Sequence, residues 1–254
     1  MNICIKKIPA QKKGRNMLHR FLILWVFVIF AKVSYAKEIT LNAAGSPPLN
    51  TPEQTGFLDL VAKKAFSRIG YTLKIVKLPA ERGLRNVNAG IEDGELFRIK
   101  GMEKLYPNLI RVPEKIIDME FVAFSQQQIE LKKGWLSLSP YSISFVNGWK
   151  IYEKNVPKQA EITKVRNAEH LFLMLIKKRT DIILYERWGG LLYIKNKQTN
   201  TIKMLLPPLA KKEMFIYLHK KHKKLVPKLT AALKQMKQDG SYNNIVAKIL
   251  TPLK

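Results

Sequence analysis

The chain is nearly without cysteine: its 254 residues include one, Cys4. That scarcity excludes an intramolecular disulfide framework and a zinc site built on several cysteines. If residues 1–36 are removed, as argued below, the remaining chain has no cysteine at all. Thiol chemistry is then excluded as well, and the fold has to be stabilised by its hydrophobic core.

Acidic residues are also scarce, with 19 Asp and Glu against 45 Lys and Arg, for a formal charge of +26. The calcium-loop pattern D-x-[DN]-x-[DN]-G-x₅-E is absent, which argues against a calcium site of that kind. His219 and His222 lie in the one dense basic cluster, HKKHKK at 219–224. Cation repulsion there favours an exposed surface over a metal site, so we expect no metal and no other cofactor.

Long apolar runs are limited to FLILWVFVIF at 21–30. Ten residues are too few to span a bilayer core of about 30 Å. Basic residues and no acidic ones precede the run, and the small residues Ser34 and Ala36 follow it. This pattern predicts that residues 1–36 are a cleaved secretory signal peptide and that the mature chain is periplasmic. An uncleaved N-terminal anchor is the alternative, and Met17 could be the true start of the signal.

The rest of the chain stays basic, because removing residues 1–36 takes away seven basic residues and leaves +19 of the +26. A strong positive charge by itself points to nucleic acid, which an exported protein rarely meets, so we expect no nucleic-acid partner. Three interpretations of the charge remain open: a solvated face, attraction to anionic envelope surfaces, or a field that favours anionic ligands.

The pattern of apolar residues predicts two α/β units in succession. Strands are expected at 38–44, 71–78 and 94–99, with helices at 56–70 and 80–90 between them. A second set follows, with strands at 141–148, 161–167, 180–186 and 213–221, a helix at 168–179, and a helical tail at 224–250. Alternation of strands and helices indicates parallel sheets with helical crossovers. Two such lobes side by side would form a ligand cleft at the carboxyl ends of their strands.

The order of these elements, with several short motifs, resembles the bacterial extracellular solute-binding proteins of family 3, the amino-acid-type receptors of ABC transporters. The motifs include TGFLDLVAKKAFSRIGYTLKIVKLPAERGL, YPNLIRVPEKI, ISFVNGW and LVPKLTAALKQMKQDGSY. The resemblance implies an α/β fold of the two-lobed, periplasmic-binding-protein-like type II, with mixed, mainly parallel sheets, flanking helices and a cleft between the lobes. It also implies lobe 1 at 37–122 and 215–254, lobe 2 at 123–214, and crossings near FVAFSQQ and KEMFIYL.

The same resemblance implies a monomeric, non-enzymatic protein that closes on a small-molecule ligand and delivers it to an ABC permease in the inner membrane. Ligand sensing without an importer is the first alternative. An enzyme related to dehydratases on this scaffold is the second, with Glu186 as the only good candidate for a general acid or base.

Site residues are carried over one position at a time. Arg98, five residues after Asp93, stands where the family places the arginine that clamps a ligand carboxylate, although the S-x-T-x-x-R pattern is missing. Glu186, five residues after Asp181, matches the carboxylate that binds the ligand ammonium. Trp149 replaces a threonine at a helix start, and Leu49 (or Pro48) replaces a stacking aromatic.

Position along the predicted strands adds two more candidates. Arg82 follows the strand that ends near Pro79, and Tyr185 lies at the end of another strand, where it or Trp188 could form an apolar wall. The acidic stretch GIEDGE at 90–95 is interpreted as a turn that begins a strand, with Asp93 in a structural role rather than as half of an acid–base pair.

Overall fold

The computed structural model describes Met1 and residues 37–253, and Lys37–Lys254 form one compact unit. The predicted signal peptide lies outside the described residues. Among those that are described, no helix is long and apolar enough to cross a membrane.

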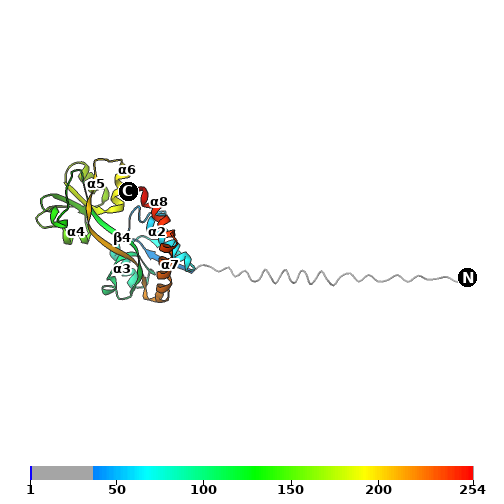
Figure 1. Ribbon diagram of the computed structural model, residues 1–254. Coiled ribbons are helices and arrows are strands. Elements are labelled where there is room, and N and C mark those ends of the chain that lie inside the picture. The colour runs from blue at the N-terminus through cyan, green and yellow to red at the C-terminus, as the bar shows by residue number, and fades with distance from the viewer. Residues whose placement is uncertain (2–36, 254) are drawn as a thin grey trace. The chain divides into compact units, whose positions relative to one another are not determined.

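Lobe 1 is built from both ends of this unit and lobe 2 from its middle (Figure 1). The elements of lobe 1 are β1 (Lys37–Asn42), α2 (Phe57–Arg68), β2 (Tyr71–Val76), α3 (Ala80–Asn88), β3 (Gly94–Ile99), η1 (Met102–Lys104), η3 (Lys220–Leu225), α7 (Val226–Gln238), α8 (Ser241–Ile249) and η4 (Thr251–Leu253). Those of lobe 2 are η2 (Gly134–Leu138), β5 (Ser142–Val146), α4 (Lys150–Asn155), β6 (Glu161–Val165), α5 (Ala168–Ile176), β7 (Ile182–Glu186) and α6 (Arg187–Lys197). The strands β4 (Leu109–Ser125) and β8 (Lys203–His219) run through both lobes.

All eight strands form one sheet in the order β2-β1-β3-β8-β4-β7-β5-β6. The pairs β1–β2, β1–β3, β5–β6 and β5–β7 are parallel, and the pairs that involve β4 or β8 with other strands are antiparallel. The two long strands pair with each other from Leu109↔His219 to Ser125↔Lys203. The predicted mixed α/β fold with two lobes is therefore confirmed.

The two lobes repeat one local arrangement at the start of a strand. Asp93, just before β3, accepts a hydrogen bond from the backbone N–H of Thr40 in β1 at 2.8 Å. Asp181, just before β7, accepts one from the N–H of Ser142 in β5 at 3.0 Å. Each aspartate thus fixes the register of a parallel strand pair, which gives the two Asp residues a structural role.

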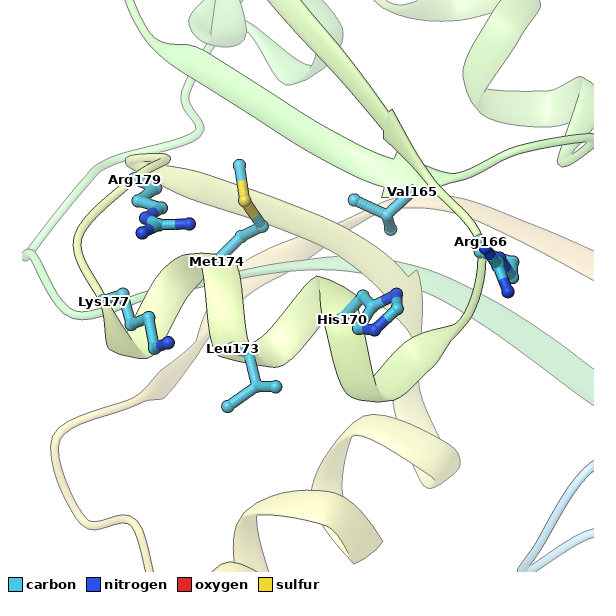
Figure 2. Close-up of a pocket in the computed structure, with 7 residues that line it drawn as sticks. All are labelled: Val165, Arg166, His170, Leu173, Met174, Lys177 and Arg179. Atoms are coloured by element: carbon cyan, nitrogen blue, oxygen red, sulfur yellow. The ribbon is translucent and has the colours of Figure 1, made fainter.

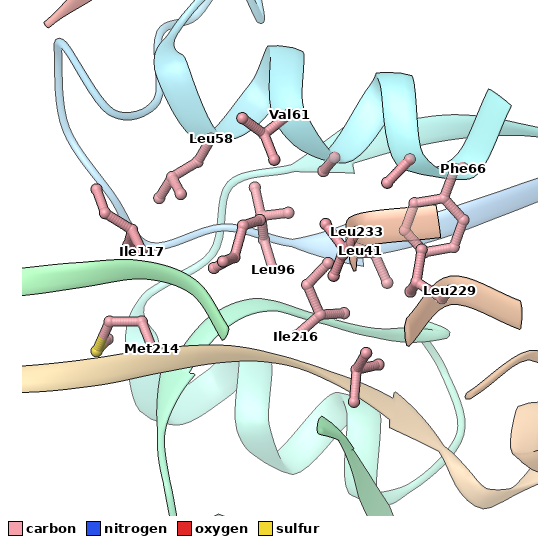
Figure 3. Close-up of a cluster of buried hydrophobic side chains, with 14 of the residues drawn as sticks. Leu41, Leu58, Val61, Phe66, Leu96, Ile117, Met214, Ile216, Leu229 and Leu233 are labelled. Atoms are coloured by element: carbon pink, nitrogen blue, oxygen red, sulfur yellow. The ribbon is translucent and has the colours of Figure 1, made fainter. Parts of the chain in front are cut away.

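The core of lobe 1 lies between its sheet and the helices α2 and α7 (Figure 3). Leu58, Val61 and Phe66 of α2 are fully buried against Leu41 and Leu96 of the sheet. The i, i+3, i+8 spacing of the α2 residues explains why one face of that helix is apolar. Across the sheet, α3 covers a smaller cluster that contains Leu84, Val87, Leu109, Phe215 and Tyr217.

Lobe 2 has a core on each face of its part of the sheet. One contains Phe145 and Tyr152 with residues from the chain around η2, and the other contains Phe124, Phe172 and Tyr185 beside α5 and α6. The predicted lobe boundaries at 122/123 and 214/215 fall within β4 and β8, and their placement stays a prediction.

The strand β8 is longer than the sequence pattern indicated. The predicted strand at 213–221 leaves out the preceding segment TIKMLLPPL, in which Pro207 and Pro208 have no N–H to donate to a sheet. In the structure, Phe121 pairs with Ala210 and Ala123 with Leu205, so a bulge that contains both prolines leaves the ladder intact on either side.

Candidate functional site

A cavity of about 640 Å³ opens between the two lobes. Its volume lies within the range of small-molecule sites, about 300–1,000 Å³. Lobe 1 contributes the loop after β1, and lobe 2 contributes the carboxyl ends of β5 and β7, the start of α5 and one side of α6. The lining residues are Ala44, Ser46, Pro47, Val146, Trp149, Arg166, Asn167, Ala168, Glu169, Tyr185, Gly189, Leu192, Tyr193, Asn196 and Lys197.

The lobe 1 wall is a loop that a buried carboxylate holds in place. Asp59 of α2 is fully buried and accepts hydrogen bonds from the side chain of Asn50 and from the N–H groups of Thr51 and Gly56, at 2.6, 2.9 and 3.0 Å. These bonds replace the water that the carboxylate loses on burial. The loop is thereby fixed on the end of α2, which positions Ser46 and Pro47 at the cavity.

Aromatic rings form the opposite wall. The ring of Trp149 stacks on Tyr152 with centroids 5.5 Å apart and lies 5.0 Å from the ring of Tyr185. Tyr152 is completely buried and its hydroxyl has no hydrogen-bond partner among the described residues. Phe121 of the crossing strand β4 meets both Trp149 and Tyr152 edge-on, at 6.2 and 5.9 Å. The wall is therefore continuous with the strand that joins the lobes.

The start of α5 supplies the polar part of the cavity. The side chain of Asn167 caps this nine-residue helix by accepting the N–H of His170 at 3.0 Å. Arg166 precedes the cap, and Glu169 lies in the first helical turn. Burial raises the pKa of the Tyr193 phenol, and the negative charge of Glu169 nearby raises it further. The helix dipole and Arg166 favour an anionic group, and Glu169 favours a cationic one.

Glu186 is not among the cavity's lining residues but is bonded to one of them, Gly189. It is 6% exposed, and its carboxylate caps α6 by accepting the N–H groups of Trp188, at 2.8 Å, and Gly189. Burial raises its pKa to about 7, because the two N–H donors only partly offset the loss of water. The same carboxylate adds to the effect of burial on Tyr185, whose pKa rises to about 12.

The beginning of α6 also joins the lobes. Arg187 forms an ion pair with Glu120 of β4, and Trp188 packs against the lobe 1 core. Farther along the helix, the Lys195 ammonium donates to the carbonyl of Pro252 in η4 at 3.0 Å. Figure 1 shows α6 beside the C-terminus, in agreement with these contacts. The cavity therefore lies next to the points where the lobes are connected.

Arg98 lies under α3, on the face of the lobe 1 sheet opposite the loop that follows β1 and lines the cavity. Its guanidinium is bound to the fully buried Glu95, with an Nε–Oε2 distance of 2.8 Å, and donates to the carbonyl of Ala80 at 3.1 Å. A bulge in β3 places residues 95 and 98 on one face, since Glu95 pairs with Tyr217 and Arg98 with Phe215. Asn42 donates to both oxygens of Glu95, at 2.9 and 3.0 Å.

Burial raises the pKa of Glu95, and the Arg98 charge and the Asn42 amide oppose that rise. The three side chains are thus a buried polar cluster that attaches α3 to the sheet. The cluster is tightly enclosed, because a Cβ on Gly83 of α3 would collide with Asn42 and Glu95.

The structure brings together some of the residues predicted for the site. Trp149 and Tyr185 line the cavity, and Glu186 is buried next to the lining residue Gly189, whose N–H it accepts. Arg98 and Arg82 are not among the lining residues, and Arg82 is exposed on α3. Leu49 is 2% exposed in the lobe 1 core, while its neighbours Ser46 and Pro47 reach the cavity. A contact between any of these residues and a ligand stays a prediction.

The sequence interpretation overlooked the polar residues Arg166, Asn167 and Glu169. Their signal was present, because the segment RNAE at 166–169 spans the end of the predicted strand at 161–167 and the start of the predicted helix at 168–179. The carboxyl end of that strand meets the same edge of the sheet as the ends of β5 and β7. Tyr193 and Lys197 also line the cavity, but they lie inside α6, where no sequence pattern marks them as cavity residues.

A second hollow of about 450 Å³ lies beside α5 (Figure 2). Its lining combines Arg166, His170, Lys177 and Arg179 with Leu173, Met174 and Val165. Only Arg166 is shared with the cavity between the lobes. Within residues 37–253, no group of three or more His, Cys, Asp or Glu side chains is arranged to hold a metal ion.

No family model matches the sequence. An uncharacterized protein of Shewanella oneidensis is 25% identical over 193 residues, which cover 72% of each chain. Among solved structures, an ancestral arginine-binding protein bound to arginine matches with a TM-score of 0.69 and 18% identity, over 84% of this chain and 98% of the other. The GluR0 ligand-binding core from Nostoc punctiforme, in complex with (L)-glutamate, has a TM-score of 0.69 at 14% identity, over 84% and 99%.

The substrate-binding protein of an amino acid ABC transporter matches with a TM-score of 0.64 at 18% identity, over 84% of this chain and 99% of the other. All three solved proteins are binding proteins or ligand-binding cores, and at these identities the likeness concerns the fold alone. The chain therefore has the two-lobed fold of amino-acid-binding proteins, with a cavity between its lobes.

Proposed function

We propose that the protein is a periplasmic solute-binding protein that captures an amino acid or a related small carboxylate between its lobes for an ABC importer. The observation that carries the proposal is the cavity between the lobes, which has aromatic walls and carries charges of both signs. Closure of the lobes around the ligand would be a hinge motion about β4 and β8.

The composition of the cavity supports a ligand with separated charges. Arg166 and the start of α5 suit a carboxylate, Glu169 suits an ammonium group, and Trp149 and Tyr185 suit an apolar or planar body between them. Lys197 adds a second cation to the lining, which favours ligands with more negative than positive charge. In this proposal Arg98 acts on the ligand only indirectly, by holding α3.

An enzymatic role has less support from the same geometry. A pKa of about 7 would suit Glu186 for general acid–base catalysis. Both carboxylate oxygens, however, are occupied by the N–H groups at the start of α6. The side chain therefore acts as a helix cap, and the proposal assigns no catalysis to it.

A thermal-shift screen of residues 37–254 against amino acids, organic acids and small peptides tests the proposal. A ligand at about 100 times its Kd adds about 2.7 kcal/mol to stability, which raises Tm by roughly 5–10 °C for a domain of this size. If no compound in a broad panel changes Tm, the solute-binding proposal is wrong.

A matched pair of variants then locates the ligand. Arg166→Gln removes a cation from the cavity, and Lys177→Gln removes one from the hollow beside α5. We expect the first to weaken binding of a carboxylate by about tenfold or more and the second to leave it unchanged. Equal effects would place the ligand outside the cavity between the lobes.

A further inference from the structure

Three loops meet at the end of lobe 1 away from lobe 2, where η3 precedes α7 (Figure 1). Asn108 accepts the N–H of Lys220 at 2.7 Å, and its amide donates to the carbonyl of Asn88 at 2.8 Å. The Lys221 ammonium donates to the carbonyl of Gly90 at 2.9 Å. Hydrogen bonds therefore join the loops around residues 88–93, 105–108 and 219–224 into one surface.

Most of the lysines on this surface lack a counter-charge. Asp93 binds Lys221 at 2.8 Å and His222 at 2.6 Å. Lys220, Lys223 and Lys224 are exposed, and none of them has an ion pair among the described residues. Two hydrogen bonds to Asp93 thus hold the turn while its remaining ammonium groups face solvent.

Two large apolar side chains are exposed on the same three loops. Ile91, next to the carbonyl that binds Lys221, is 69% exposed. Leu105, three residues before Asn108 and directly after the exposed Lys104, is 71% exposed. We call the set the basic end of lobe 1; it comprises Ile91, Lys104, Leu105, Lys220, Lys221, Lys223 and Lys224.

From this combination we propose that the basic end of lobe 1 docks on an anionic phospholipid bilayer. A cluster of four to eight basic residues is attracted to anionic headgroups, and exposed aliphatic side chains beside it can enter the headgroup region. An acidic protein partner would pair with the lysines but would leave the isolated Ile91 and Leu105 without a matching pocket. None of the residues of the basic end lines the cavity between the lobes.

The expected strength follows from the number of unpaired lysines. Each lysine near an anionic membrane surface contributes about 1 kcal/mol, equivalent to about a fivefold change in affinity. Neutralising Lys220, Lys223 and Lys224 together should therefore weaken binding roughly 100-fold. Salt should weaken the wild type as well, because these charges are exposed to solvent.

Vesicle co-sedimentation of residues 37–254 tests whether the basic end of lobe 1 docks on an anionic bilayer. One set of vesicles is phosphatidylcholine alone, and in the other about a third of the lipid is phosphatidylglycerol. We expect binding only to the second set, and loss of that binding in the variant Lys220→Gln/Lys223→Gln/Lys224→Gln. The control is Lys154→Gln/Lys158→Gln/Lys177→Gln, which removes the same charge from exposed positions of lobe 2 and should bind like the wild type.

Ile91→Ser tests the apolar part of the surface. We expect it to weaken vesicle binding several-fold without changing retention on heparin, a polyanion with no apolar phase. The proposal is overturned if the wild type does not bind vesicles that contain phosphatidylglycerol, or if both triple variants lose vesicle binding equally. It is also overturned if Ile91→Ser has no effect on vesicle binding and heparin competes fully with the vesicles. The last result would assign the surface to soluble polyanions.

Discussion

Replacing Arg98 by alanine should destabilise the unliganded protein, because it leaves the buried Glu95 carboxylate without its cation. Glu95 is fully buried and the Arg98 side chain is 14% exposed. Removing one partner of a buried ion pair costs about 3–5 kcal/mol. The residual exposure of Arg98 places the expected loss near the lower end, about 3 kcal/mol, or roughly 6–12 °C in Tm for a domain of this size.

The loss should depend on pH in a definite direction. Burial already raises the pKa of Glu95, and without the Arg98 charge the pKa of the folded state rises further. A carboxyl with a raised folded-state pKa stabilises the fold most when it is protonated, and the stability falls as pH rises through that pKa. The difference between wild type and variant should therefore be larger at pH 8 than at pH 5.

Urea unfolding at several pH values measures both quantities. Arg82→Ala is the matched control, since Arg82 is exposed and has no ion pair among the described residues; its effect should stay within about 0.5 kcal/mol. Adding Glu95→Gln to Arg98→Ala should recover part of the loss by removing the unpaired charge. A loss below about 1 kcal/mol that is the same at every pH would refute the buried-pair reasoning.

Two further carboxylates should give pH effects of opposite sign. Glu186 has a pKa of about 7 in place of 4.5, so the stability of the wild type should fall between those pH values, and Glu186→Gln should flatten this slope in chemical denaturation; an unchanged slope would contradict the assignment. Burial alone would raise the pKa of Asp93, but hydrogen bonds from Lys221, Thr40 and His222 lower it. Its stabilisation is therefore present above its unfolded-state pKa and lost in acid, so Asp93→Asn should cost about 1–2 kcal/mol at pH 7 and less at pH 3, and equal costs would be evidence against these bonds. Gly190→Ala should destabilise by about 1–3 kcal/mol, because the added Cβ would collide with the ring of Phe124, and a neutral effect would mean that α6 packs less closely on β4.

Periodicity and turn residues predicted most of the elements that position the site, but not α6, which forms one side of the cavity. The helical spacing of Phe57, Leu58, Val61, Ala65 and Ile69 identified α2, and the aspartates before β3 and β7 were correctly placed at strand starts. Trp149 was chosen because it replaces the threonine that the resembled family has at a helix start, and Tyr185 because it lies at the end of a strand. Both line the cavity, as expected where strand ends gather at one edge of an α/β sheet.

Contacts between distant segments could not be read from local patterns. Strand alternation alone would place Arg98 and Glu95 on opposite faces of β3, whereas the bulge places them on the same face. The capping role of Glu186 depends on how α6 begins, immediately after β7, and a helix start this abrupt has no periodic signal. Likewise, the first half of β8 could not be predicted from its own residues. Pro207 and Pro208 are unfavourable in a strand, and the bulge that accommodates them forms only against the partner strand β4.

The central claim, ligand capture between the lobes, is tested most directly by the fluorescence of Trp149. Residues 37–254 contain three tryptophans, of which Trp149 alone lines the cavity. We predict that a compound found in the thermal-shift screen changes the emission with saturating one-to-one behaviour. The change should disappear in Trp149→Phe and persist in Trp135→Phe and Trp188→Phe. A response that survives in Trp149→Phe and is lost in either of the others would contradict binding in the cavity.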